Sequence, residues 1–173
     1  EMCIRDSANI NEIRIDEVGS VINELDKNED LSYTIYQSSE NNKVTGYAIP
    51  IAGKGLWGTM YGYFAIEPDA ETVKGITFYK HKETPGLGAE VDKDWFKNNF
   101  VGKKLTNKNG ELVSIEVIKG YVSDTDPDAP HKVDGISGAT ITGTGLTTFL
   151  KSDLQKYEPY FAKVRSINQI ESL

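Results

Sequence analysis

Four strand-like segments joined by short turns are the feature that most limits how this chain of 173 residues can fold. The segments are residues 31–37, 44–52, 59–67 and 73–80. Each is rich in Tyr, Thr, Ile or Val, the residues that favour a pleated and half-buried surface. The turns between them contain Gly, Pro, Asn or Asp, at residues 38–43, 53–58 and 68–70. Because short turns join antiparallel neighbours, this pattern predicts an antiparallel meander.

Two longer segments carry apolar residues at a helical period of about 3.6. The first covers residues 9–25, with apolar residues at Ile10, Ile13, Val18, Val21, Ile22 and Leu25. The second contains Leu146, Phe149, Leu150, Leu154 and Tyr157. Pro159 follows it, and proline breaks or kinks a helix. The pattern therefore predicts an N-terminal helix and a C-terminal helix that runs to about Tyr157.

Two shorter elements are expected between the meander and the C-terminal helix. Trp95, Phe96 and Phe100 predict a short helix at residues 94–100 with all three rings on one face. Residues 112–122 are expected to form a further strand. Together these elements predict an α+β fold, a single domain in which an antiparallel sheet is flanked by N-terminal and C-terminal helices.

The first seven residues look foreign to the rest of the chain. Residues 1–7 resemble a translated sequencing-adapter fragment, and we exclude this leader from the fold. Residues 8–30 are then the N-terminal helical segment, and residues 31–173 are the main domain. Cys3 is the only cysteine, so the chain can form no internal disulfide and no cysteine metal cluster.

Charge and hydropathy exclude several kinds of partner. The formal net charge of −7 argues against nucleic acid, because phosphate binding needs clustered Lys and Arg. No stretch approaches the roughly 18 to 20 consecutive apolar residues of a membrane helix. Asp124, Asp126 and Asp128 alternate as in a calcium loop, but Ala129 and Gly135 stand where that loop needs Gly and Glu. We therefore expect an acidic connector and no metal site.

A stretch of small and hydroxyl residues, residues 134–142 (DGISGATIT), precedes the predicted C-terminal helix. Gly138 and Ala139 leave room for a ligand to approach the backbone closely. Thr140 and Thr142 lie where the helix begins, and the free N–H groups and positive dipole end at that point can bind a phosphate. The stretch predicts a phosphate held beside a hydroxyl. A plain N-cap without a ligand is the alternative.

Three other features allow more than one interpretation. Ser137 lies in a sequence close to the Gly-x-Ser-x-Gly turn of hydrolases, although Ala139 breaks that pattern. His81 and Glu83 precede a Pro-Gly turn, either as an acid–base pair or as polar groups that fix a loop. Trp57 lies in a glycine-rich loop and is more typical of a core residue than of a cofactor contact.

Three sequence blocks, taken together, point to a known family. They are residues 55–62 (GLWGTMYG), residues 81–91 with their ETPGLG core, and residues 134–142. In order and spacing these blocks resemble the FMN-binding domain family, over about residues 47–154. The family includes the C subunit of sodium-translocating NADH:quinone oxidoreductase (NqrC) and the G subunit of the Rnf complex (RnfG). The first two blocks together favour the NqrC branch.

The resemblance implies that FMN is attached to the hydroxyl of Thr140 through a phosphoester. Ser137, Gly138 and Ala139 would let the backbone approach the phosphate and the ribityl chain. Thr142 would donate to the same phosphate or cap the helix.

The resemblance also implies a maturation enzyme, a flavin transferase that uses FAD as donor. Asp134 would belong to the motif that this transferase recognises.

A second wall of the flavin site is implied by the ETPGLG block. Its residues would be Glu83, Thr84, Gly86, Leu87 and Gly88. Leu87 would lie against the isoalloxazine ring, with Trp57 nearby. The flavin carries the redox chemistry, so the resemblance implies neither a catalytic side chain nor a metal ligand.

At the level of function, the resemblance implies an electron-transfer subunit with covalent FMN in a sodium-pumping NADH:quinone oxidoreductase complex. Such a subunit is enzymatic only as part of the complex, so no turnover is expected of this domain alone. Its partners would be the other subunits and the flavin transferase. A membrane helix missing from this sequence would anchor it to the bacterial inner membrane, with the domain on the periplasmic side. The alternatives are an RnfG-like FMN subunit of a ferredoxin:NAD oxidoreductase complex, a Ser137 hydrolase and a non-redox binding module.

Overall fold

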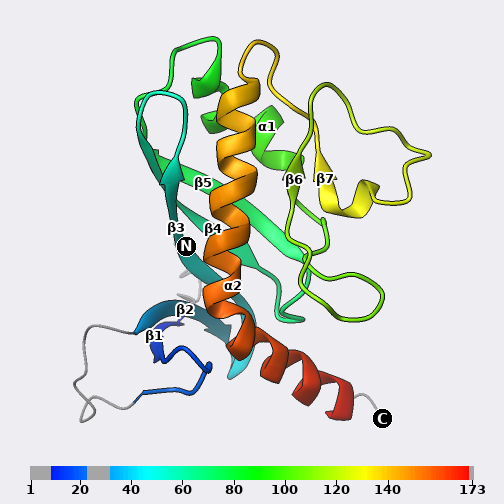
Figure 1. Cartoon of the computed structure of the whole chain (residues 1–173). Helices are drawn as coiled ribbons and strands as arrows, with labels where there is room; N and C mark the ends of the chain where they lie inside the picture. The colour runs from blue at the N-terminus through cyan, green and yellow to red at the C-terminus, as the bar shows by residue number, and fades with distance from the viewer. Residues whose placement is uncertain (1–8, 23–31, 172–173) are drawn as a thin grey trace, which may run out of the picture.

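A computed structural model describes residues 9–22 and 32–171, and its main strands form one five-stranded antiparallel sheet (Figure 1). The strands are β1 (Asn9–Ile15), β2 (Tyr33–Glu40), β3 (Lys43–Lys54), β4 (Thr59–Ile66) and β5 (Val73–Lys80). They lie side by side in the order in which they occur in the chain. The predicted antiparallel meander is confirmed, and β1 adds a strand at its N-terminal edge.

The long C-terminal helix α2 (Thr140–Glu171) lies across one face of the sheet (Figure 1). Side chains alternate between the two faces of a strand, so every second residue meets the helix. Ile49, Ile51 and Phe64 from the sheet are buried in one core with Leu146 and Leu150 from the helix. This sheet and helix make up the predicted α+β fold.

The first part of α2 packs directly against β3 because glycines leave no side chain between them. A Cβ atom on Gly53 would lie 2.1 Å from Cγ of Phe149, and one on Gly145 would lie 2.3 Å from the carbonyl oxygen of Lys54. These contacts hold the start of the helix against the end of β3.

The predicted N-terminal helix over residues 9–25 is wrong, because β1 pairs with β2 instead. Ile15 is fully buried, and it lies two positions after Ile13, a spacing that fits the period of a strand and not the helical period of 3.6. Asp16 ends the strand by accepting two backbone N–H groups of the turn that follows, at 3.0 and 2.7 Å. The leader, residue 8 and residues 23–30 lie outside the described residues.

The C-terminal helix continues past its predicted end near Tyr157 and contains Pro159. Figure 1 shows the helix axis changing direction between its orange and red parts, as a proline inside a helix causes. Packing stabilises the part beyond the proline. The ring of Phe161 lies 5.5 Å from that of Tyr47, and Arg165 donates to a carbonyl of the β4–β5 turn over 3.1 Å.

The segment between the sheet and α2 contains only short elements. They are η2 (Gly88–Asp92), α1 (Asp94–Asn98), β6 (Glu116–Val117), η3 (Ala129–His131) and β7 (Lys132–Val133). The helix expected at 94–100 is confirmed as α1, and Phe96 and Phe100 are fully buried while Trp95 is exposed. None of the helices in the described part of the chain is both long enough and apolar enough to cross a membrane.

The strand expected at residues 112–122 is reduced to β6, which pairs in parallel with β7. Ser114 adopts a left-handed conformation with φ of 70°, which interrupts an extended chain. The N–H groups of residues 113 and 114 also both donate to the carbonyl of Leu105. The rest of the predicted strand therefore becomes loop.

We expect Gly145→Ala to destabilise the fold by about 1–3 kcal/mol, because the added methyl group forces α2 away from β3. Gly75→Ala is the control, since a Cβ atom there meets nothing within 4 Å. That change should be neutral or stabilising by up to about 1 kcal/mol. Urea unfolding of both variants measures the difference, and equal stabilities would contradict the close packing of α2 on β3.

Candidate functional site

Three loops meet around the start of α2, at the upper end of Figure 1. Residues 55–58 connect β3 to β4 and close with a hydrogen bond from the N–H of Gly55 to the carbonyl of Gly58, 2.8 Å long. Residues 81–88 follow β5, and Thr84 accepts the N–H groups of Leu87 and Ala89 at 3.1 Å. Residues 134–139 lead directly into the helix. These loops correspond to the three sequence blocks.

The carboxylate of Glu83 joins the three loops. Glu83 is only 6% exposed. Its Oε1 accepts the backbone N–H of Trp57 over 3.0 Å, and its Oε2 accepts the hydroxyl of Thr142 over 2.6 Å. One side chain from the second loop therefore holds both the first loop and the first turn of α2.

Two glycines make room for this carboxylate. A Cβ atom on Gly55 would lie 2.5 Å from Oε1 of Glu83, and one on Gly88 would lie 2.3 Å from Oε2. Both distances are far below a van der Waals contact, so any larger residue would displace the carboxylate. Gly55 and Gly88 thus leave room for the buried carboxylate of Glu83. Gly88 is itself buried.

His81 supports the same loop and does not form an acid–base pair with the carboxylate of Glu83. Its Nε2 lies 2.5 Å from Oδ2 of Asp92, and its Nδ1 accepts the backbone N–H of Glu83 over 3.1 Å. Of the two interpretations of His81, the structure supports the one in which it fixes a loop.

Thr140 is the first residue of α2, and its side chain is exposed. The N–H groups of the first helical turn have no acceptor within the helix and carry the positive end of its dipole. Ser137 and Gly138 are exposed just before it, while Ala139 is buried. A hydroxyl therefore stands beside free N–H donors, as the sequence predicts.

Gly138 has a positive φ of 75°, which favours glycine at this turn. A Cβ atom there would lie 2.8 Å from Cδ2 of Leu87, so Leu87 covers the turn closely. The second and third sequence blocks are in direct contact at this point.

Thr142 does not take either of the roles expected of it. It is the third residue of α2, it is fully buried, and its hydroxyl donates to Glu83. It neither caps the helix nor faces the surface where a phosphate would lie. Its role is to connect the helix to the loop behind the site.

Large apolar side chains are exposed in the first two loops and in the first turn of α2. Trp57 is 64% exposed, Ile141 63% and Leu87 43%. The interpretation of Trp57 as a core residue is therefore wrong. Thr84 and Gly86 are exposed in the same loop as Leu87. Exposed apolar groups of this size mark a ligand or partner surface.

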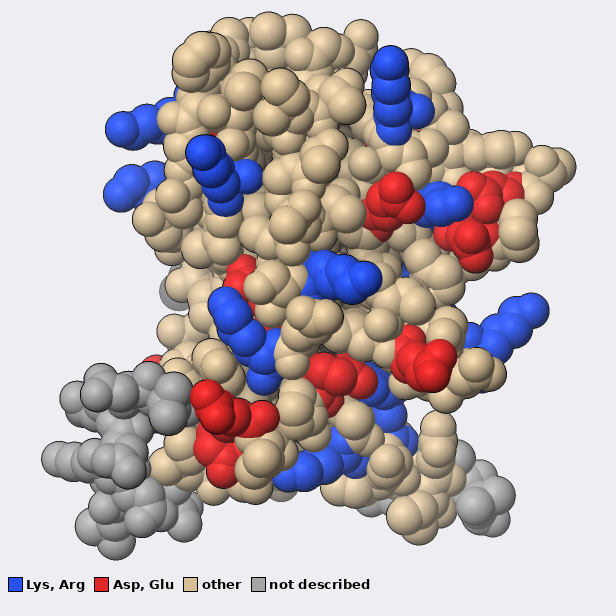
Figure 2. Space-filling model, viewed as in Figure 1, with Lys and Arg blue, Asp and Glu red and all other residues tan. Residues whose placement is uncertain are grey.

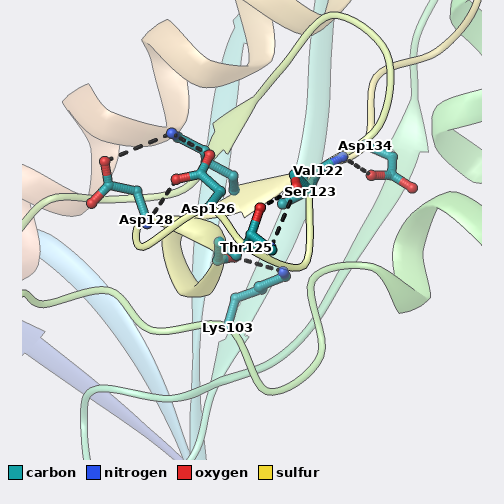
Figure 3. A network of polar contacts seen from close by, with 9 residues as sticks. Lys103, Val122, Ser123, Thr125, Asp126, Asp128 and Asp134 are labelled. Carbon is teal, nitrogen blue, oxygen red and sulfur yellow. Dashed lines mark hydrogen bonds and ion pairs between the residues drawn. The ribbon is translucent and has the colours of Figure 1, made fainter.

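The acidic connector is held by its own hydrogen bonds (Figure 3). Asp134 accepts the N–H of Val122 over 2.7 Å, and Lys132 lies 2.9 Å from Asp126 and 3.7 Å from Asp128. The hydrogen bond from Lys132 holds the pKa of Asp126 below its usual value, and the same bond raises the pKa of Lys132. Lys132 thus supplies a counter-charge to Asp126 and Asp128.

The structure also contains a cavity that the sequence did not predict. It has a volume of about 470 Å³ and lies between residues 116–121 and residues 135–144, next to Thr140. Residues 116–121 were expected to belong to a plain strand. The only sequence signal of a loop there was Gly120.

Ser137 lacks the partner that a hydrolase needs. His81 is bonded to Asp92 and Glu83, and Nδ1 of His131 lies 2.7 Å from the carbonyl of Lys104. Neither histidine is hydrogen-bonded to Ser137, so the described residues do not form a nucleophile and base. Within those same residues there is also no group of three His, Cys, Asp or Glu side chains that could hold a metal ion.

The surface charge differs between the site and the rest of this face. Figure 2 shows Lys and Arg side chains at the upper end, where α2 begins, while Asp and Glu gather further down. Lys54 ends β3, and the side chain of Lys82 lies near Gly58. The site therefore carries positive charge on an acidic protein, which favours an anionic ligand.

An exposed hydroxyl, free helix N–H groups and a cavity define a binding domain for a phosphate-containing ligand. Residues 55–155 match the family model of the FMN-binding domain. The chain belongs to this family, in the branch of the C subunits of Na⁺-translocating NADH-quinone reductases (NqrC).

Relatives of that name share about two fifths of their aligned residues with this chain. The Pseudomonas aeruginosa protein is 40% identical over 134 residues, which cover 76% of this chain and 51% of that protein. The Chlamydia muridarum protein is 44% identical over 132 residues, covering 68% of this chain and 42% of that protein. The chain thus spans about half the length of the relatives it matches.

Two solved structures have the same fold. Shewanella oneidensis NqrC superposes with a TM-score of 0.77 at 27% identity, covering 91% of this chain and 84% of that one. The NqrC protein of Parabacteroides distasonis gives a TM-score of 0.75 at 32% identity, covering 87% of this chain and 77% of that one.

We expect Thr142→Val to lower the free energy of unfolding by about 1–3 kcal/mol, because it leaves Oε2 of Glu83 buried without a donor. Thr144→Val is the matched control. The Thr144 hydroxyl is exposed and bonds only to the carbonyl of Thr140, so the loss should stay within about 0.5 kcal/mol. Guanidinium unfolding measures the free energy of unfolding of both variants. Equal losses would show that the hydrogen bond from Thr142 to Glu83 adds no more stability than that of an exposed hydroxyl.

Proposed function

We propose that this domain carries FMN as a phosphoester on Thr140 and serves as an electron-transfer subunit. The observation that carries the proposal is the exposed hydroxyl of Thr140 beside the free N–H groups of α2, within a domain of the FMN-binding family. A covalent link keeps the flavin in place between successive electron transfers.

The residues around Thr140 fit the parts of such a flavin. Ser137 and Gly138 are exposed and leave the backbone open to the phosphate. Leu87, exposed beside Gly138, and Trp57 offer apolar surface to the isoalloxazine ring. Glu83 and Gly88 are buried, so they act by holding this surface in place. Bound FMN would supply the redox chemistry, and the protein would supply position and exposure.

The names of the relatives support a place in a larger complex. We propose that the domain belongs to a sodium-translocating NADH:quinone reductase, with the other subunits as partners. It would be anchored to the bacterial inner membrane and face the periplasm. The isolated domain would transfer electrons without turning over NADH and quinone. A flavin transferase that recognises residues around Thr140, including Asp134, would load the flavin.

The four relatives named above are all NqrC proteins, which favours this complex over the Rnf complex. A Ser137 hydrolase is disfavoured because neither histidine is bonded to Ser137.

Co-expression with a flavin transferase tests the attachment. The wild-type chain should gain the mass of one FMN less one water and fluoresce in a denaturing gel. Thr140→Ala should lose both signals completely, because no other atom replaces the hydroxyl. Thr148→Ala, which removes an exposed hydroxyl two turns further along α2 and outside the cavity lining, should retain them.

A wild-type chain without added mass would refute the proposed function. Flavin that persists in Thr140→Ala would place the attachment elsewhere.

A further inference from the structure

The cavity beside Thr140 has a wall that the proposed function leaves without a role. Residues 116–121 form this wall, facing residues 135–144. The volume of about 470 Å³ lies in the range of about 300–1,000 Å³ that small-molecule sites occupy. None of the three sequence blocks includes a residue of this wall.

Hydrogen bonds anchor the backbone of the wall at four points. The anchored groups are the N–H groups of Val117, Ile118 and Val122 and the carbonyl of Gly120. Their partners belong to α2, β7 and the 134–135 turn, at 2.7 to 3.0 Å. Lys119 lies between these points, is exposed, and is one of the residues that line the cavity. A rigid backbone therefore presents a flexible cation at the cavity beside Thr140.

The cavity lining contains one acidic and one basic side chain. Glu116 and Lys119 are the two charged residues among its lining. Lys132 has a raised pKa, mainly because of its hydrogen bond with Asp126, and Glu116 adds to that effect. Glu116 is also the register partner of Lys132 across β6 and β7, which places that lysine on the neighbouring strand beside it. Among the described residues Lys119 takes part in no ion pair, so its charge is available to a ligand.

Resting on the attachment of FMN to Thr140, we propose that Lys119 binds the phosphate of that ester and that the cavity holds the phosphate and the ribityl chain. A phosphodiester keeps one negative charge. The lysine ammonium group offers it a point charge and three donors, while the first turn of α2 offers N–H groups from the other wall. The isoalloxazine ring then lies towards Leu87, outside this cavity.

The test compares Lys119→Ala in the unmodified and the flavinylated protein. Without flavin the side chain is exposed and unpaired, so its removal should leave the melting temperature unchanged. With flavin attached, the same change should lower the melting temperature by about 2–4 °C. Each flavinylated variant is separated from unmodified protein, and intact mass confirms that it is fully loaded before it is melted. The extent of loading therefore does not affect the result.

Two variants separate a phosphate contact from a general effect of charge. Lys119→Arg keeps the cation and should restore the melting temperature of the flavinylated protein. Lys151→Ala removes an exposed lysine of α2 that does not line the cavity, and should change neither form.

A flavinylated Lys119→Ala protein with the wild-type melting temperature overturns this inference and leaves the attachment at Thr140 intact. An equal loss in both forms also overturns it, because the lysine would then stabilise the fold alone. A wild-type chain that gains no flavin overturns the proposed function, and this inference with it.

Discussion

The buried carboxylate of Glu83 is the interaction on which the site depends. Burying a carboxylate costs free energy unless donors surround it, and here the donors are the N–H of Trp57 and the hydroxyl of Thr142. Trp57 belongs to the β3–β4 loop and Thr142 to the first turn of α2, so the carboxylate is satisfied only when the loop and the helix are both in place. The same contact fixes the first turn of α2. As a result, Thr140 is exposed on a helix whose start cannot shift independently of the loops.

The start of α2 is held from three directions. Gly145 brings it against the end of β3, Thr142 ties it to Glu83, and residues 117–122 are bonded to the turn before it. This arrangement suits the proposed function, in which the redox group is carried on one covalent bond. The protein needs to hold that group in a defined place and leave it accessible, and rigid surroundings with an exposed apolar surface do both.

Much of the fold follows from local patterns, because alternation and short turns specify an antiparallel meander and the spacing from Leu146 to Tyr157 specifies a helix. The N-terminal segment was predicted wrongly: Ile10, Ile13 and Val21 suggested a helix, but Ile13 and Ile15 share the spacing of a strand, and pairing with β2 makes residues 9–15 a strand. The end of α2 was also wrong, because packing of Phe161 against Tyr47 outweighs the local effect of Pro159. Trp57 was expected in the core and lies on the surface. Thr142 was expected beside the phosphate and is buried.

The sequence by itself determined the chemical character of this protein: three blocks of glycines and hydroxyls, their order, and a threonine at a helix start. Each of these is a local property, set by backbone conformation and residue type. Only the tertiary structure decided what the blocks do together. Glu83 lies 59 positions before Thr142 in the chain, and no local pattern shows that its carboxylate meets that hydroxyl. The wall at Lys119 likewise becomes part of the site only because long-range hydrogen bonds bring it beside Thr140.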